Sequence, residues 1–182
     1  MEHHGLTRRC YSGILVKNAD GIDLRQGCHD ILIENITGFT EDDSIAITAL
    51  NGQLEQTFAV KGLASDICNV KIKNIKTAAF CTNVRLLNQG GIKLHDIELD
   101  GVFDEAEDCP HLTKGLYTVR IGDTHLYGER HANADETYNI SIKNVKSNAW
   151  TAAIGLAGNM KKVTFENIEC LGDTQEFEDK RN

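Results

Sequence analysis

Proline, aromatic residues and positive charge are all scarce in this 182-residue chain. It has one proline, Pro110, against 16 glycines, and its aromatic residues are six phenylalanines, four tyrosines and one tryptophan. Lysine and arginine total 19 against 27 aspartates and glutamates, which gives a formal charge of −8. Because contact with nucleic acid phosphates needs a basic surface, the composition excludes nucleic acid as the main partner.

Long apolar runs, paired cysteines and amphipathic helical patterns are also missing. No run approaches the roughly 18 apolar residues of a membrane span, and the first ten residues show no apolar core of a signal peptide. The six cysteines form no Cys-x-x-Cys pair, which disfavours zinc-ribbon and thioredoxin-type sites, so we expect buried free thiols. With 41 % hydrophobic and 25 % charged residues, the chain suits a single globular domain.

The chain does contain an internal repeat. Five segments alternate apolar and polar residues, as a strand does, and place Asn or Asp just before a final aliphatic residue. These segments are 31–36, 70–75, 92–97, 140–145 and 163–168, and their starts lie 39, 22, 48 and 23 residues apart. A second short apolar strand accompanies them at 22–24, 45–47, 84–86, 119–121 and 154–156.

A period in the low twenties with several short strands per repeat predicts an all-β solenoid, a right-handed parallel β-helix of roughly six coils. Its strands would stack about 4.8 Å apart over continuous apolar ladders. Asn suits such coils because it tolerates the left-handed conformation and its amides can bond along the stack. A leucine-rich repeat would need the LxxLxLxxN spacing, which is absent, and a β-sandwich would not produce this register.

The repeat covers one domain, residues 1–182, with two interruptions at about 51–66 and 103–136. We expect both to be loops that project from one side, where long insertions usually carry function. The charged tail, 172–182, is expected to fray or to cap the last coil. No amphipathic helix covers the first coil, which suggests a truncated chain or an end covered by a partner, including a second copy.

Three acidic residues fall at one point of the repeat. Asp20 stands two residues before Ile22 and Asp43 stands two before Ile45, so a 23-residue period puts them on adjacent strands, with Asp42 beside them. Carboxylates this close raise at least one pKa, and one acid beside one base is the equipment of glycoside hydrolysis. The same residues could instead bond backbone N–H groups at turns or hold calcium.

The segment Asn18-Ala-Asp-Gly-Ile-Asp23, followed by Glu41-Asp-Asp-Ser-Ile-Ala-Ile47, resembles the polygalacturonase-type hydrolases of glycoside hydrolase family 28. These belong to the pectin-lyase-like superfamily of right-handed parallel β-helices, with the signatures N-T-D-G, G-D-D-C-I-A-I, G-H-G and R-I-K. The specific similarity runs from Asn18 to Thr48, and the rest of the chain shares only the general coil pattern.

The resemblance assigns roles to individual residues. It implies that Asp42 is the general acid, that Asp20 and Asp43 activate water, and that the reaction inverts the anomeric centre. It places Asn18 and the arginine of R-I-K, here Arg120, at the substrate. It also implies a polysaccharide substrate, no cofactor and an extracellular location.

Two basic positions of the family signatures are replaced in this chain, besides Ala19 in place of the motif threonine and the loss of both glycines of G-H-G. Cys81 occupies the histidine slot of G-H-G, and Gly122 occupies the lysine slot of R-I-K. The lost lysine favours a neutral sugar over galacturonate, or a protein without turnover. Arg85, one coil below Arg120, competes for the same electrostatic role.

Other residues are candidates for binding sugar or metal. Tyr127, in the second insertion, is the best aromatic candidate for stacking on sugar. His111, His125 and His131 lie near acidic residues, but their spacing matches no tight ligand motif, so we predict no metal site.

The main hypothesis is therefore an inverting glycoside hydrolase. The alternative is a truncated or catalytically degenerate β-helix that binds glycans or assembles without turnover. A third, weaker possibility is a surface-fibre β-helix that trimerises. Asn35-Ile-Thr37 matches a glycosylation sequon, but its ladder position predicts burial.

Overall fold

The computed structural model describes residues 19–52, 57, 59–105 and 114–181, and every regular element within them is a β-strand. The strands are β1 (Ile22–Leu24), β2 (His29–Thr40), β3 (Ile45–Ala49), β4 (Ile67–Ala79), β5 (Thr82–Asn88), β6 (Leu94–Asp104), β7 (Tyr117–Ile121), β8 (Thr137–Ser147), β9 (Ala152–Ala157), β10 (Lys161–Cys170) and β11 (Gln175–Lys180). Within these residues no helix is long and apolar enough to cross a membrane.

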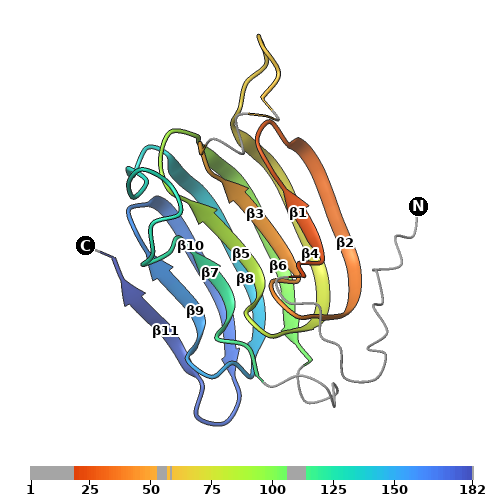
Figure 1. Ribbon diagram of the computed structural model, residues 1–182. Coiled ribbons are helices and arrows are strands. Elements are labelled where there is room, and N and C mark those ends of the chain that lie inside the picture. Colours follow the sequence, from red (N-terminus) through yellow and green to blue (C-terminus); the bar gives the residue numbers. More distant parts are fainter. Residues whose placement is uncertain (1–18, 53–56, 58, 106–113, 182) are drawn as a thin grey trace.

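The strands form two parallel sheets between which the chain alternates. The odd-numbered strands form a six-stranded sheet in the order β1-β3-β5-β7-β9-β11, and the even-numbered strands form a five-stranded sheet in the order β10-β8-β6-β4-β2. Figure 1 shows them side by side from β1 and β2 at one end to β10 and β11 at the other. The all-β, parallel part of the prediction is confirmed.

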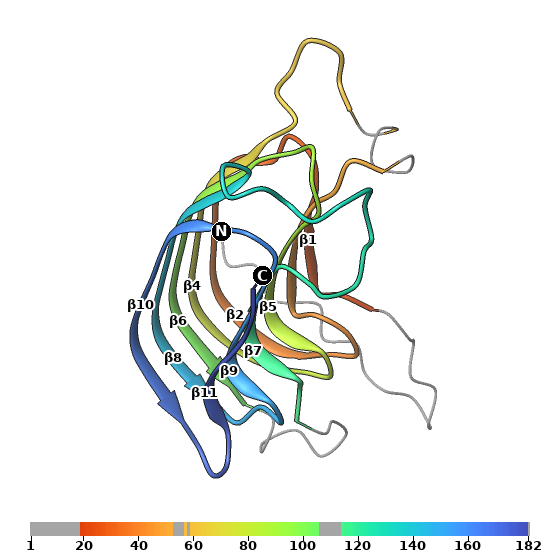
Figure 2. The ribbon, with the colours of Figure 1, turned by 90° about the vertical axis from the view of Figure 1, so that its left-hand side faces the viewer.

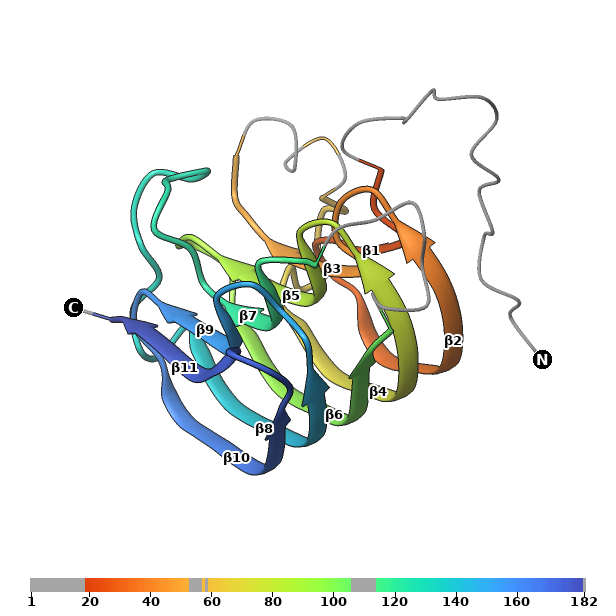
Figure 3. The ribbon, with the colours of Figure 1, turned by 90° about the horizontal axis from the view of Figure 1, so that it is seen from below.

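The core lies between these sheets, which occupy opposite sides of the molecule in Figures 2 and 3. One ladder of inward side chains runs through the whole six-stranded sheet: Ile22, Ile45, Val84, Val119, Ile154 and Phe177 are successive partners. The predicted positions of the short strands are thus correct. Burial of each aliphatic side chain in such a ladder stabilises the fold by roughly 1.5–3 kcal/mol, because its apolar surface is removed from water.

Each long even-numbered strand has a pair of left-handed residues five positions apart, and β2 has positive φ at Gly38 as well. Their backbone φ is positive at Asp30 and Asn35, Asn69 and Asn74, Asp96 and Gly101, Asn139 and Asn144, and Lys162 and Asn167. Neighbouring amides bond along the stack, as from Asn74 Nδ2 to Asn35 Oδ1 at 2.7 Å. The conformation and stacking expected of Asn are confirmed. Asn35 is exposed, however, so its predicted burial was wrong, and burial gives no argument against the sequon.

One repeat was placed in the wrong register. The expected copy was 92–97, but the structure pairs Val70 with Ile97 and Ile75 with Val102, a slip of five residues. The true copy is 97–102, with Gly101 in the place of the asparagine. The error arose because each long strand has two left-handed positions five residues apart, and Asp96 occupies the first of them.

Two expected irregular segments contain strands. Residues 103–104 complete β6, so the second interruption begins later than expected, and β7 inside it is the short strand predicted at 119–121. The tail 172–182 contains β11, whose Phe177 pairs with Ile154 of β9, so it extends a sheet and is not frayed. No strand occurs in the described part of 51–66, as expected.

The described cysteines are free, as predicted, but they are half-buried and not fully buried. They are Cys28, Cys68, Cys81 and Cys170.

The left-handed residues give a stability prediction. Asn74→Ala should lower the free energy of unfolding by about 1–2 kcal/mol, because a Cβ-bearing residue without a local polar side chain is strained at φ 50°. Asn74→Gly relieves that strain and should lose distinctly less, as measured by urea unfolding. Equal stability of the two variants would show that backbone conformation does not limit this position.

Candidate functional site: an aspartate cluster

The parallel ladder continues beyond the strands into the turns that carry the aspartates. Ile22 pairs with Ile45, and just before them the Gly21 N–H donates to the Asp43 carbonyl at 3.0 Å. The Asp42 N–H also donates to the Ala19 carbonyl at 3.3 Å. The turn before β1 is thus fixed against the turn before β3.

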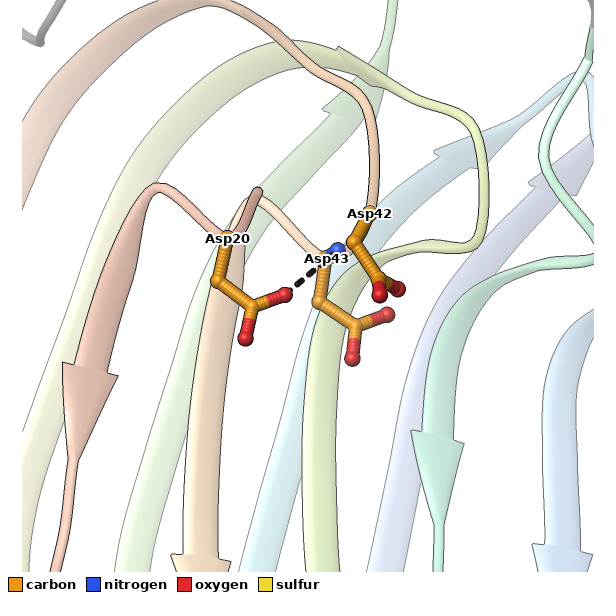
Figure 4. A group of neighbouring side chains, drawn as sticks. All are labelled: Asp20, Asp42 and Asp43. Atoms are coloured by element: carbon orange, nitrogen blue, oxygen red, sulfur yellow. Dashed lines mark hydrogen bonds between the residues drawn. The ribbon is translucent and has the colours of Figure 1, made fainter. Parts of the chain in front are cut away.

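The three predicted catalytic aspartates meet at this point (Figure 4). One carboxylate oxygen from each of Asp20, Asp42 and Asp43 lies within 4.8 Å of those of the other two. The backbone N–H of Asp43 donates to Asp20 Oδ1 at 3.0 Å. Asp43 is only 2 % exposed, whereas Asp20 and Asp42 are half-buried. Its Oδ1 is buried and has no hydrogen-bond partner among the described residues.

Burial dominates the electrostatics of this cluster. The pKa of Asp43 is raised to about 7, mainly by burial and in part by the charges of Asp42 and Asp20, against the lowering effect of Arg85. The pKa of Asp20 is also raised, mainly by burial, although the hydrogen bond from the Asp43 N–H acts in the other direction. The cluster therefore holds a proton that can be given or taken near neutral pH.

Arg85 is the basic group that contacts the cluster. It lies on β5, and its Nη1 is 3.4 Å from Asp43 Oδ2. Arg120, its partner on β7, lies one strand further away and binds Asp123 Oδ1 at 2.8 Å. Asp123 is buried and also binds Arg85 Nη2 at 2.5 Å, so it separates the two guanidinium groups. Arg120 reaches the aspartates only through Asp123 and Arg85.

Tyr127 lies against the same network. Its ring centroid is 5.3 Å from the Arg85 guanidinium carbon. The loop that carries it is held by buried Gln89, whose Nε2 donates to the His125 carbonyl and whose Oε1 accepts from the Tyr127 and Gly128 N–H groups. Sequence reasoning missed Gln89, because no motif marks a glutamine that follows a strand.

Cys81 occupies the turn before β5, beside Asp42. Burial, the hydrogen bond with Asp42 and the charge of Asp42 raise the pKa of its thiol to about 12. The thiol therefore stays protonated, and it is placed to donate to the Asp42 carboxylate.

Gly122 cannot be replaced by a lysine in this fold. Its φ is +73°, and a Cβ there would lie 1.9 Å from the Ala157 carbonyl oxygen. The lysine slot of the R-I-K motif is thus closed by the backbone of β9, which pairs with β7.

Two predicted residues lie outside the described part of the chain, namely Asn18 and His111. Within the described residues, the three aspartates are the one group of three or more acidic, histidine or cysteine side chains close enough to hold a metal ion. The Arg85 guanidinium beside Asp43 and the raised pKa of that carboxyl both weaken a cation site. Proton transfer suits this arrangement better.

No family model, no curated protein and no solved structure matches the chain. The functional argument therefore depends on the residues and their geometry.

The raised pKa of Asp43 makes stability depend on pH. The native state binds the Asp43 proton more tightly than the unfolded chain, so the stability this proton provides is complete below about pH 4 and is lost as the pH rises through 7. Asp43→Asn carries no such proton, so its stability relative to the native sequence should increase between pH 4 and 8. Urea unfolding at intervals of pH measures this difference, and a difference that does not change with pH would contradict the assignment.

Proposed function

We propose that this chain is a right-handed parallel β-helix that hydrolyses glycosidic bonds of a plant or microbial polysaccharide through Asp20, Asp42 and Asp43. The observation that carries the proposal is the buried Asp43 carboxyl, with a pKa of about 7, beside two further carboxylates. Such a set supplies a proton donor and a proton acceptor at one pH.

The β-helix is supported by the strict alternation of the chain between two parallel sheets and by the unbroken inward ladder. The resemblance to glycoside hydrolase family 28 supports the same architecture. It also suggests an extracellular location.

The proposed mechanism uses the three carboxylates in two roles. Asp42, which is more exposed than Asp43, delivers a proton to the leaving oxygen, as the resemblance implies. Asp20 and Asp43 hold the attacking water: their nearest oxygens lie within 4.8 Å, and a water with two hydrogen bonds of about 2.8 Å can bridge that gap. Before substrate binds, the proton of the cluster resides on Asp43. It must pass to Asp42 before Asp42 can act as the acid and Asp43 can accept a proton from water.

A second candidate is a degenerate β-helix that binds glycans without turnover. Cys81 and Gly122 favour it, because neither can supply the charge of the family histidine or lysine. Product release decides between the two candidates.

Removal of the acid should abolish hydrolysis. Asp42→Asn is expected to lower kcat at least about 100-fold on any polysaccharide that the protein cleaves, because a lost general acid typically costs that much. Reducing-sugar release measures the effect, and Asp173→Asn, an exposed aspartate in the turn after β10, is the matched control. Equal loss in both variants, or in neither, would reject the assignment.

The anomeric outcome tests the mechanism separately. The expected inversion comes from the resemblance, yet the carboxylates are closer than the roughly 6.5–9.5 Å usual for single displacement. Proton NMR of the first product should show inverted configuration if Asp20 and Asp43 activate water. Retention would instead make one of the carboxylates a nucleophile.

A further inference from the structure

We infer that the sugar unit bound at the aspartate cluster is uncharged. This inference rests on the proposed hydrolase function and names the substrate class of the same site. It follows from the charges around the cluster, from the closed lysine slot and from the side chains on the adjoining turns.

Acidic groups outnumber basic ones at the cluster within the described residues. The carboxyl groups of Asp20, Asp42, Asp43 and Asp123 meet two guanidinium groups, those of Arg85 and Arg120. Asp23 on β1 forms an ion pair with Arg25 just after that strand, with 3.6 Å between Asp23 Oδ1 and Arg25 Nη2. A substrate carboxylate would thus meet a surplus of like charge, which costs several kcal/mol at an interface.

Both arginines are already bound by buried Asp123, so a substrate carboxylate would have to share their guanidinium groups with it. Arg85 is held between Asp43 and Asp123, and its Nε is buried. Arg120 is held by Asp123, and its guanidinium carbon lies 5.1 Å from the centre of the Tyr117 ring. Removing one partner from such a pair leaves an uncompensated buried charge, which is strongly destabilising.

No third cation can be supplied by the position after Ile121. At Gly122 a side chain would collide with the Ala157 carbonyl. Among the described residues, the other cation near this edge is Lys114, whose Nζ lies 5.8 Å from the centre of the Trp150 ring. Trp150 precedes β9, three strands from β3, which is roughly 14 Å at the usual strand spacing. Lys114 therefore lies beside Trp150 and not beside the sugar unit held at Asp43.

The adjoining turns present apolar side chains. Phe80, Leu116 and Trp150 occupy successive turns beside Asp42 and are 49, 46 and 65 % exposed. The turns are joined by hydrogen bonds, from the Leu116 N–H to the Cys81 carbonyl at 2.8 Å and from the Thr151 N–H to the Leu116 carbonyl at 3.1 Å. An exposed apolar row of this kind fits the C–H faces of sugar rings, along a chain that runs across the strands.

The test compares polymers that differ only in charge. Polygalacturonate, rhamnogalacturonan and glucuronoxylan are each paired with their carboxyl-reduced forms, which keep the linkages and lose the charge. Reducing-sugar release by the native protein is measured on all six polymers. Binding is measured by calorimetry with the Asp42→Asn variant at 0.05 and 0.5 M NaCl.

We expect release and binding to be at least tenfold greater for the reduced member of a pair. For the charged member we expect binding that strengthens with salt, because salt screens the repulsion. Trp150→Ala should weaken binding of the reduced polymer several-fold, whereas Leu63→Ala, an equally exposed leucine on another loop, should not.

The outcomes separate the inference from the proposed function. Faster cleavage of a charged polymer supports the hydrolase and overturns the uncharged sugar. Binding of reduced polymers without release overturns the hydrolase and supports the uncharged ligand. Tighter binding of charged polymers without release, or no binding to any polymer, overturns both.

Discussion

In-register parallel pairing along the six-stranded sheet is the constraint on which the rest of the structure depends. Ile22, Ile45 and Val84 are partners on successive strands. Ile45 and Val84 are buried and Ile22 packs against the same core, which fixes the register because a slip of one residue would turn each ladder outward. The same register brings Asp20 against Asp43, although 23 residues separate them. Burial of the apolar ladder thus holds the aspartate carboxylates close together, although their charges repel one another.

The site shows how that crowding is moderated. Burial removes water from the Asp43 carboxylate and raises its pKa, and the charge of Arg85 offsets only part of that rise. The pKa of Asp43 is therefore about 7, above the usual value of an aspartate. Asp123 binds the two arginines that face each other on β5 and β7, which would otherwise repel. The result is a proton held beside two ionisable neighbours, with a surrounding field that disfavours anions.

Much of this could be predicted from the sequence, because period and alternation follow directly from how parallel strands stack. The alternation gave the positions of the short strands, and the 23-residue spacing gave the aspartate cluster. The predicted alignment of 92–97 with the other copies was wrong, because each long strand has a pair of left-handed positions and its sequence can be aligned on either one. The sequence does not separate Arg85 from Arg120 and does not indicate Gln89. Arg85 contacts Asp123 and Tyr127, and Gln89 contacts His125, all in the loop after β7, whose path no local pattern specifies.

The central claim is that the fold holds Asp43 as a proton carrier near neutral pH. Carbon-13 NMR titration of aspartate carboxyls, in the native protein and in Asp43→Asn, tests it most directly. The account predicts one carboxyl with a midpoint near pH 7 that is missing from the variant, and a higher midpoint for that carboxyl in Arg85→Gln. Titration of every aspartate at its ordinary value, close to pH 4, would contradict the account.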